Sequence, residues 1–277
     1  MDPIRVAIAG AGGRMGQALI EASLAAPQLR LAAALDLPGS VSIGHDAGAR
    51  FGRATGITIS ADIEAALARS DVLIDFTRPD GTLVHLSACA ANAVAAVVGT
   101  TGLSDAQKAT LATHARRIPI LFAANMSVGV NVLLSLVENA ARRLGPDYDV
   151  EIVELHHRHK VDAPSGTALR LGEAVATGLG RSLAECASYA RHGVTGERPR
   201  GAIGFAALRG GDVVGEHMVV FAGTGERVEI AHRATSRQNF AAGALRAAEF
   251  VAAKRNDGTA GLFDMRDVLD LHDGKET

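Results

Sequence analysis

The chain has 277 residues, enough for one large domain or two ordinary ones, and its 48% hydrophobic and 21% charged residues are typical of a globular protein. The formal net charge of −2, from 28 basic and 30 acidic residues, argues against nucleic acid or an anionic membrane as a partner, so we expect a small ligand. Cys89 and Cys186 form no C-x-x-C pair, and neither a secretion signal nor an apolar run of the ~20 residues that span a membrane is found. We therefore expect two buried thiols and a cytoplasmic protein.

Short apolar runs alternate with helical stretches in the first half of the chain. These runs cover residues 4–9, 29–35, 72–76, 94–98 and 118–122, and each ends in glycine, alanine or polar residues. Strands that alternate with helices predict a parallel sheet, as in Rossmann-like α/β domains.

The pattern changes beyond residue 127, where we place a domain boundary. A helix is predicted over 130–144 and a strand over 150–155, followed by a Gly- and Arg-rich loop over 189–201. Three further strands are predicted over 202–208, 213–221 and 228–232, and the short GG and GTGE connections predict antiparallel hairpins. The second domain is therefore expected to be α+β. A helix over 239–254 and an apolar segment over 261–271, expected to dock on the first domain, complete the chain.

The first strand ends in the turn IAGAGGRMG. Its glycines permit a tight turn, a close approach of backbone to pyrophosphate and a helix N-terminus that favours an anion. The match to G-x-G-x-x-G is imperfect, because Met15 replaces the third glycine and the spacing is that of Gly10, Gly13 and Gly16. Asp36 ends the second strand, where a carboxylate can bind the adenosine ribose hydroxyls, although an exposed turn residue is the alternative.

The ends of the later strands should meet the same dinucleotide, because the carboxyl ends of parallel strands open on one crevice. The residues concerned are Thr77, Arg78, Gly99, Thr100, Thr101, Ala123, Ala124, Asn125 and Met126. Each of these turns alone is also compatible with an ordinary strand–helix connection.

The most unusual stretch is HHRHKVDAPSGT, residues 156–167. A strand leads into the histidines, and Pro164 precedes a helix start that Ser165 or Thr167 could cap. A metal site is disfavoured, because Arg158 and Lys160 would repel a cation and no further ligand set is evident. Proton transfer and anion binding at the helix N-terminus both remain possible chemistries for His156, His157, His159 and Lys160, beside a plain helix start.

Together these motifs resemble the 4-hydroxy-tetrahydrodipicolinate (dihydrodipicolinate) reductase family of the diaminopimelate and lysine pathway. The stretches that carry the resemblance run in the family's order along nearly the whole chain: VAIAGAGGRMG, DFTRPDGT, GTTG, FAANMSVGVN, ELHHRHKVDAPSGTA, TGERPRGAIGFAALRGGDVVGEH and GLFDMRDVLDL. Of these, HHRHKVDAPSGTA is the most specific and the glycine turn the least.

The resemblance implies NADH- or NADPH-dependent reduction of a small dicarboxylate, with no metal. It implies phosphate binding by Gly10, Ala11, Gly12, Gly13, Arg14 and Met15, ribose binding by Asp36, and nicotinamide contacts from residues 99–101 and 123–126. By the same resemblance, His156 and Lys160 transfer protons, while His157, Gly166 and Thr167 bind the substrate carboxylates. His159 has no assigned role, and Asp162 is expected only to orient its neighbours.

The resemblance also implies a dinucleotide-binding domain from residues 1–127 and 238–277, and a substrate and homotetramer domain from residues 128–237. One departure concerns the cofactor: Leu37 follows Asp36 where relatives that bind NADPH well often have arginine, so we expect tolerance of NADH or a preference for it unless Arg50 or Arg53 compensates. The alternatives are a reductase of another small dicarboxylic imine, a non-catalytic NAD(P) sensor, and a metal-dependent enzyme built on the histidines.

Overall fold

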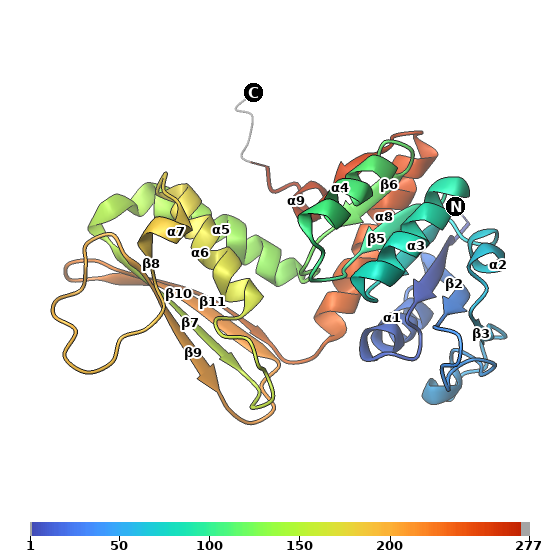
Figure 1. Ribbon diagram of the computed structural model, residues 1–277, viewed down its shortest axis with the longest axis horizontal. Helices are drawn as coiled ribbons and strands as arrows, with labels where there is room; N and C mark the ends of the chain where they lie inside the picture. The colour runs from blue at the N-terminus through green and yellow to red at the C-terminus, as the bar shows by residue number, and fades with distance from the viewer. Residues whose placement is uncertain (1, 273–277) are drawn as a thin grey trace. The chain divides into compact units, whose positions relative to one another are not determined.

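The computed structural model describes residues 2–272, and these residues form two compact units. The first unit takes residues 2–128 and 237–272, and the second takes residues 129–236. Among the described residues, no helix is both long and apolar enough to cross a membrane. The expected fold class is confirmed, since one unit is a helix-flanked parallel sheet and the other an α+β structure (Figure 1).

The first unit is built on a seven-stranded sheet in the order β12-β6-β5-β4-β1-β2-β3, with every neighbouring pair parallel. Most strands are continuous apolar runs, as expected where helices cover both faces of a sheet. The strands are β1 (Ile4–Ala9), β2 (Leu29–Leu35), β3 (Ile59–Ser60), β4 (Val72–Asp75), β5 (Ala95–Val98), β6 (Pro119–Phe122) and β12 (Gly261–Phe263). The segment 261–271 thus docks on the first unit, as predicted.

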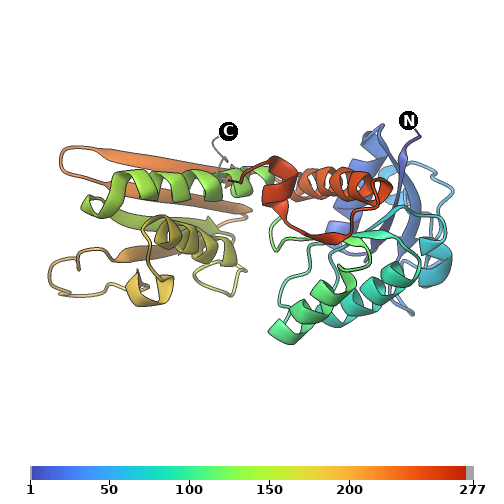
Figure 2. The ribbon, with the colours of Figure 1, turned by 90° about the horizontal axis from the view of Figure 1, so that it is seen from above.

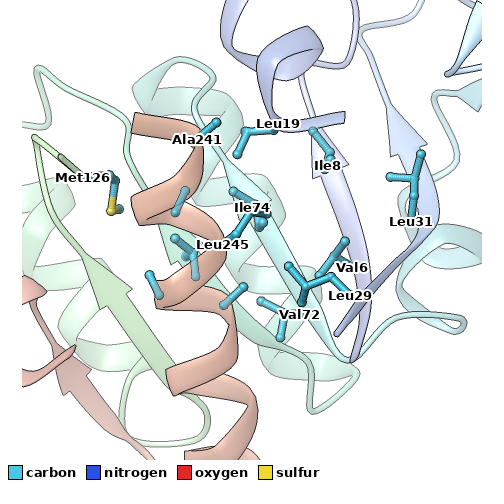
Figure 3. Close-up of a cluster of buried hydrophobic side chains, with 14 of the residues drawn as sticks. Val6, Ile8, Leu19, Leu29, Leu31, Val72, Ile74, Met126, Ala241 and Leu245 are labelled. Carbon is cyan, nitrogen blue, oxygen red and sulfur yellow. The ribbon is translucent and has the colours of Figure 1, made fainter. Parts of the chain in front are cut away.

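Alternate residues of the central strands enter two separate cores, as the pleat of a strand requires. One core includes Val6 and Ile8 and packs against α1 (Arg14–Ala25) and α8 (Gln238–Asn256), as Figure 3 shows. The other includes Ala7 and Ala9 and packs against α2 (Ile63–Leu67), α3 (Pro79–Ala91) and α4 (Asp105–His114). Figure 2 shows α8 on one side of this unit and α3 and α4 on the other. The unit also contains η1 (Ala49–Phe51) and α9 (Met265–Leu269).

The second unit has a five-stranded sheet in the order β11-β10-β7-β9-β8. The inner face of the sheet packs against α5 (Val128–Leu144) and α6 (Gly166–Gly178). The strands are β7 (Asp149–His156), β8 (Ala187–Ser188), β9 (Ile203–Arg209), β10 (Gly215–Ala222) and β11 (Arg227–Ala234). The remaining elements are η2 (Gly145–Asp147) and α7 (Leu183–Cys186). Cys186 here and Cys89 in the first unit are both buried free thiols, as predicted.

One of the predicted hairpins is wrong. β10 and β11 do form an antiparallel hairpin, but β9 pairs in parallel with β7, which lies between β9 and β10. The chain after β9 instead crosses the end of β7, where Gly210 donates to the His156 carbonyl at 2.9 Å and His157 donates to the Val213 carbonyl at 2.8 Å. Gly210 and Gly211 therefore belong to a loop that crosses the end of β7. The hydrogen bonds from this loop hold the backbone at His156 and His157.

Candidate functional site

The glycine turn between β1 and α1 leaves the start of the helix open. Gly10 has a φ of +72°, which favours glycine, and Gly13 caps the helix without a side-chain hydrogen bond. A Cβ at Gly16 would lie 2.0 Å from the Gly10 carbonyl oxygen, so only glycine lets the helix pack this closely on the turn. Ala11 is buried, Arg14 is exposed and Met15 is half-buried at the start of α1. Uncapped N–H groups at a helix N-terminus are suited to a phosphate.

Asp36 lies beside this turn. Its Oδ2 accepts hydrogen bonds from the Gly12 backbone N–H at 3.0 Å and from Ser40 Oγ at 2.9 Å, while Oδ1 accepts from the Leu37 backbone at 2.8 Å. A Cβ at Gly12 would lie 2.5 Å from Oδ2, so the glycine keeps this space open. The residues predicted to bind the phosphates and the ribose are therefore neighbours, and their arrangement fits a dinucleotide.

A cavity of about 260 Å³ adjoins the turn and is lined by residues that include Gly12, Ser42 and Arg50. Arg53, the second arginine considered for cofactor binding, instead donates to the Leu24 carbonyl at 3.1 Å. Of these two cations, only Arg50 lines the cavity beside Gly12.

The ends of β4, β5 and β6 are adjacent because the three strands are neighbours in the sheet. Arg78 precedes α3 at the end of β4, and a Cβ at Gly10 would lie 3.1 Å from Thr77 Cγ2, which places this turn beside the glycine turn. Gly99 accommodates the Phe76 ring, since a Cβ there would lie 2.2 Å from it. At the next two ends Thr100, Ala123 and Met126 are buried, whereas Thr101 and Ala124 are exposed and Asn125 is half-buried.

A buried polar network that the sequence did not reveal supports these turns. Asp75 is 1% exposed and accepts hydrogen bonds from the Thr77 backbone and hydroxyl at 2.7 and 2.6 Å. His85 Nδ1 lies 2.8 Å from its other oxygen, and the Thr82 and Thr100 hydroxyls are 2.7 Å apart. Burial raises the pKa of Asp75, but the bonds from His85 and Thr77 outweigh it and lower the pKa below its usual range. The charged carboxylate thus holds the turn after β4.

In the second unit, His156 is the last residue of β7 and is buried. Its Nδ1 lies 2.5 Å from Glu154 Oε2, and Glu154 is 1% exposed. Arg209 donates to both Glu154 oxygens, at 2.8 and 2.9 Å, and the Ser165 backbone donates to Oε1 at 3.1 Å. The carboxylate of Glu154 is therefore held by three residues from three different parts of the unit.

His217, on β10, completes this cluster. Its ring centroid lies 5.1 Å from that of His156, in an edge-to-face arrangement, and its Nε2 lies 3.0 Å from Ser165 Oγ. Burial and the neighbouring His156 lower the pKa of His217 to about 4, so the ring is neutral near pH 7. Glu154, Arg209 and His217 did not figure among the sequence-predicted site residues.

The loop after β7 brings the remaining candidates to the start of α6. Ser165 caps this helix by accepting a hydrogen bond from the Ala168 backbone at 3.2 Å, and Gly166 and Thr167 are its first two residues. Lys160 Nζ donates to both Asp162 oxygens, at 2.7 and 2.8 Å. The His157 and His159 rings lie 6.2 Å apart. Among residues 2–272, no group of three or more His, Cys, Asp or Glu side chains is placed to hold a metal ion.

Comparison with known proteins identifies the family. The N-terminal family model of dihydrodipicolinate reductase matches residues 4–126, and its C-terminal model matches residues 129–269. The chain belongs to the dihydrodipicolinate reductase family. It is 57% identical over 271 residues to the 4-hydroxy-tetrahydrodipicolinate reductase of Burkholderia mallei strain SAVP1, covering 98% of this chain and 100% of that protein.

Two further members of the dihydrodipicolinate reductase family agree with this assignment. The 4-hydroxy-tetrahydrodipicolinate reductase of Cupriavidus pinatubonensis is 59% identical over 268 residues, covering 97% of this chain and all of that protein. A dipicolinate-bound dihydrodipicolinate reductase from Paenisporosarcina sp. TG-14 superposes with a TM-score of 0.73 at 25% identity, covering 95% of this chain and 98% of that one. The resemblance stated from the sequence is thereby confirmed.

Proposed function

We propose that the protein reduces 4-hydroxy-tetrahydrodipicolinate to tetrahydrodipicolinate with loss of water, in diaminopimelate and lysine biosynthesis. The observation that carries this proposal is the match, over 97% or more of the chain, to reductases named for this substrate. Atoms balance when one hydride and one proton enter the ring system and one water leaves. A reduced nicotinamide dinucleotide supplies the hydride when bound.

His156 and Lys160 are the proposed proton-transfer residues. A histidine ring can take a proton as neutral imidazole and release it as imidazolium near neutral pH, and a lysine held by a carboxylate has a fixed direction for its ammonium group. The pairing of Lys160 with Asp162 supports this role for the lysine and the orienting role expected for Asp162. The buried pairing of His156 with Glu154 supports a fixed orientation for the histidine.

The substrate carboxylates are proposed to bind at the N-terminus of α6. Gly166 and Thr167 are the first two residues of this helix, where the positive end of the helix dipole favours an anion. A Cβ at Gly166 would meet no atom within 4 Å, so the glycine leaves open space there. His157, in the loop before the helix, is proposed as a further carboxylate ligand.

The cofactor is proposed to bind the first unit through residues 10–15, Asp36, Arg78 and the turns at 99–101 and 123–126. We expect NADH to be tolerated or preferred, because the Asp36 carboxylate would repel a 2′-phosphate and Leu37 offers no compensating cation, unless Arg50 supplies one. The ratio of kcat/KM for the two cofactors decides this point, and a strong preference for NADPH would contradict it. Arg50→Ala then shows whether Arg50 contributes to NADPH binding.

A coupled assay tests the activity itself. Aspartate semialdehyde, pyruvate and the upstream synthase generate the substrate, and nicotinamide absorbance follows oxidation of NADH or NADPH. Oxidation that depends on both the synthase and this protein is expected. If neither cofactor is oxidised, the protein is not this reductase, and NADH binding without turnover would favour the sensor alternative.

The second unit is also proposed to form a homotetramer through the outer face of its sheet. Leu155 and Leu208 are register partners on this face, beside Val153 and Met218, and Leu208 is 46% exposed. An apolar sheet face of this kind is suited to an interface between copies. Light scattering after size-exclusion chromatography should give four chains per particle, and Leu208→Asp should lower that number. A monomer at micromolar concentration would refute the proposal.

A further inference from the structure

A charged residue occupies the buried face of β7. The side chains of Val150, Ile152, Glu154 and His156 alternate onto this face, and Glu154 is 1% exposed. Burying a carboxylate without partners costs several kcal/mol, so the surroundings must compensate for the charge. This position in a strand is normally apolar, which makes the glutamate the feature that needs an explanation.

Arg209 supplies that compensation. It is the register partner of His156 on β9, and its two terminal nitrogens bind the two oxygens of Glu154 in a bidentate pair. Burial raises the pKa of Glu154, but the bonds from Arg209, His156 and Ser165 outweigh it and lower the pKa below its usual range. Glu154 is therefore a carboxylate that only accepts hydrogen bonds.

The charge on Glu154 dictates which nitrogen of His156 carries hydrogen. An acceptor 2.5 Å from Nδ1 requires that Nδ1 be the protonated nitrogen, so in the neutral ring Nε2 is the one with a free lone pair. A Cβ at residue 215 would lie 2.9 Å from Nε2, and the glycine found there keeps that space clear. The ring is thus held at one nitrogen, and glycine at residue 215 leaves room beside the other.

The other titratable and charged groups around the ring do not supply an acceptor to Nδ1. His217 on β10 lies edge-on to the ring and its Nε2 pairs with Ser165, and its low pKa keeps it neutral. Lys160 pairs with Asp162 in the loop. The groups that face this cluster are Glu154 of β7, Arg209 of β9, His217 of β10, His232 of β11, and Lys160 and Asp162 of the loop.

We propose that Glu154 is a positioning residue that holds His156 with hydrogen on Nδ1, presents Nε2 as the atom that takes and releases the proton, and stabilises the imidazolium. Arg209 keeps Glu154 ionised for this role. The inference deepens the proposed function, since it assigns the reacting nitrogen of a histidine already given a proton-transfer role.

Nitrogen-15 NMR of the histidine rings in the ligand-free protein tests the tautomer. His156→Gln identifies the signals of His156 among those of the 10 histidines. We expect the Nδ1–H form in the wild type and a rise in the Nε2–H form in Glu154→Ala, because Nδ1 loses its acceptor. Glu151→Gln is the matched control: Glu151 also pairs with arginines, Arg191 and Arg198, but on the opposite face of β7, so the His156 signals should not change.

Glu154→Gln separates charge from packing, because glutamine keeps the volume and removes the charge. In the coupled assay, kcat should fall roughly 10- to 100-fold with little change in the KM for NADH. This loss is smaller than the ~100- to 10,000-fold that a proton-transfer group itself contributes, as expected for a positioning residue. Far-ultraviolet circular dichroism checks that both variants fold.

The two proposals fail in different ways. An Nε2–H form in the wild type, a tautomer unchanged in Glu154→Ala, or a kcat unchanged in Glu154→Gln overturns the role of Glu154 even if the enzyme is active. Absence of turnover in the coupled assay overturns the proposed function and leaves the NMR result for Glu154 intact.

Discussion

The candidate site of the first unit consists mainly of backbone groups, whereas the candidate site of the second unit contains buried charged side chains. Gly10, Gly12 and Gly16 shape the turn before α1, and in each case a side chain would fill space that the turn needs. In the second unit, Glu154, Arg209 and His156 form a buried ionic cluster at the end of β7. Added side-chain atoms should disturb the backbone site, whereas removal of one charged partner should disturb the ionic cluster. The two regions should therefore respond to different substitutions.

The largest effect is expected from Lys160→Ala, which tests whether chemistry belongs to the second unit alone. Loss of a proton donor should lower kcat ~100- to 10,000-fold, while the Kd for NADH, measured by fluorescence, should not change. Lys108→Ala is the control, because Lys108 also pairs with an aspartate, Asp105, on the exposed surface of α4. An unchanged kcat would contradict the proton-transfer role of Lys160. A weakened affinity for NADH would show that the second unit also contributes to cofactor binding.

A smaller effect is expected from His217, through the pH dependence of stability. Its pKa is lowered from 6.5 to about 4 in the folded state, so the unfolded chain binds more protons between these values. Stability should therefore fall as the pH drops from about 6.5 to about 4, by roughly 3 kcal/mol from this group. His217→Gln should remove that part of the fall in urea titrations at several pH values, and the exposed His192→Gln should not. Identical profiles for all three proteins would contradict the buried neutral state of His217.

Gly16→Ala tests the backbone side of the comparison. The new Cβ would lie 2.0 Å from the Gly10 carbonyl oxygen, and overpacking of this kind costs about 1–3 kcal/mol. Gly81 is a matched control, since it occupies the same third position of α3 and a Cβ there would approach nothing closer than Thr77 Oγ1 at 3.3 Å. Thermal unfolding should show a loss for Gly16→Ala that is absent for Gly81→Ala. NADH affinity should fall with the first variant only.

The smallest effect is expected from Ser165→Ala, which removes the cap of α6. Loss of a helix N-cap costs ~1 kcal/mol, and the change also removes the partner of His217. Ser182→Ala is the comparison, because Ser182 occupies the N-cap of α7 without a side-chain cap hydrogen bond. Equal midpoints of urea unfolding for the two variants would show that the Ser165 cap contributes nothing.

Sequence patterns predicted the first unit well because its signals are local. The strands over 4–9 and 29–35 match β1 and β2 residue for residue, and the nearness of Asp36 to the glycine turn follows from the order of parallel strands. The same logic placed a helix start after Pro164 with Ser165 or Thr167 as its cap, and Ser165 is the N-cap of α6. Each of these features depends on residues that lie within a few positions of a turn.

The parts that the sequence did not reveal depend on pairing between distant strands. Arg209 and Glu154 are 55 residues apart, and Ser165 and His217 are 52 apart, so no local pattern connects them. The wrong β9–β10 hairpin has the same origin, since the position of β7 between them is set by the sheet and not by the GG turn. One signal was present: in VEIVELH the glutamate at 154 falls on the apolar side of the strand alternation, which marks a buried charge.

Gly243 of α8 lies close to the turn that follows β6. A Cβ there would lie 1.8 Å from the Met126 carbonyl oxygen, and Ala241 and Leu245 of the same helix enter the core that contains Val6 and Ile8. That core therefore lacks one wall until residues beyond 240 have left the ribosome, whereas residues 129–236 already contain their whole sheet. During synthesis, the unit encoded in the middle can fold while the one begun first still waits for its last helix.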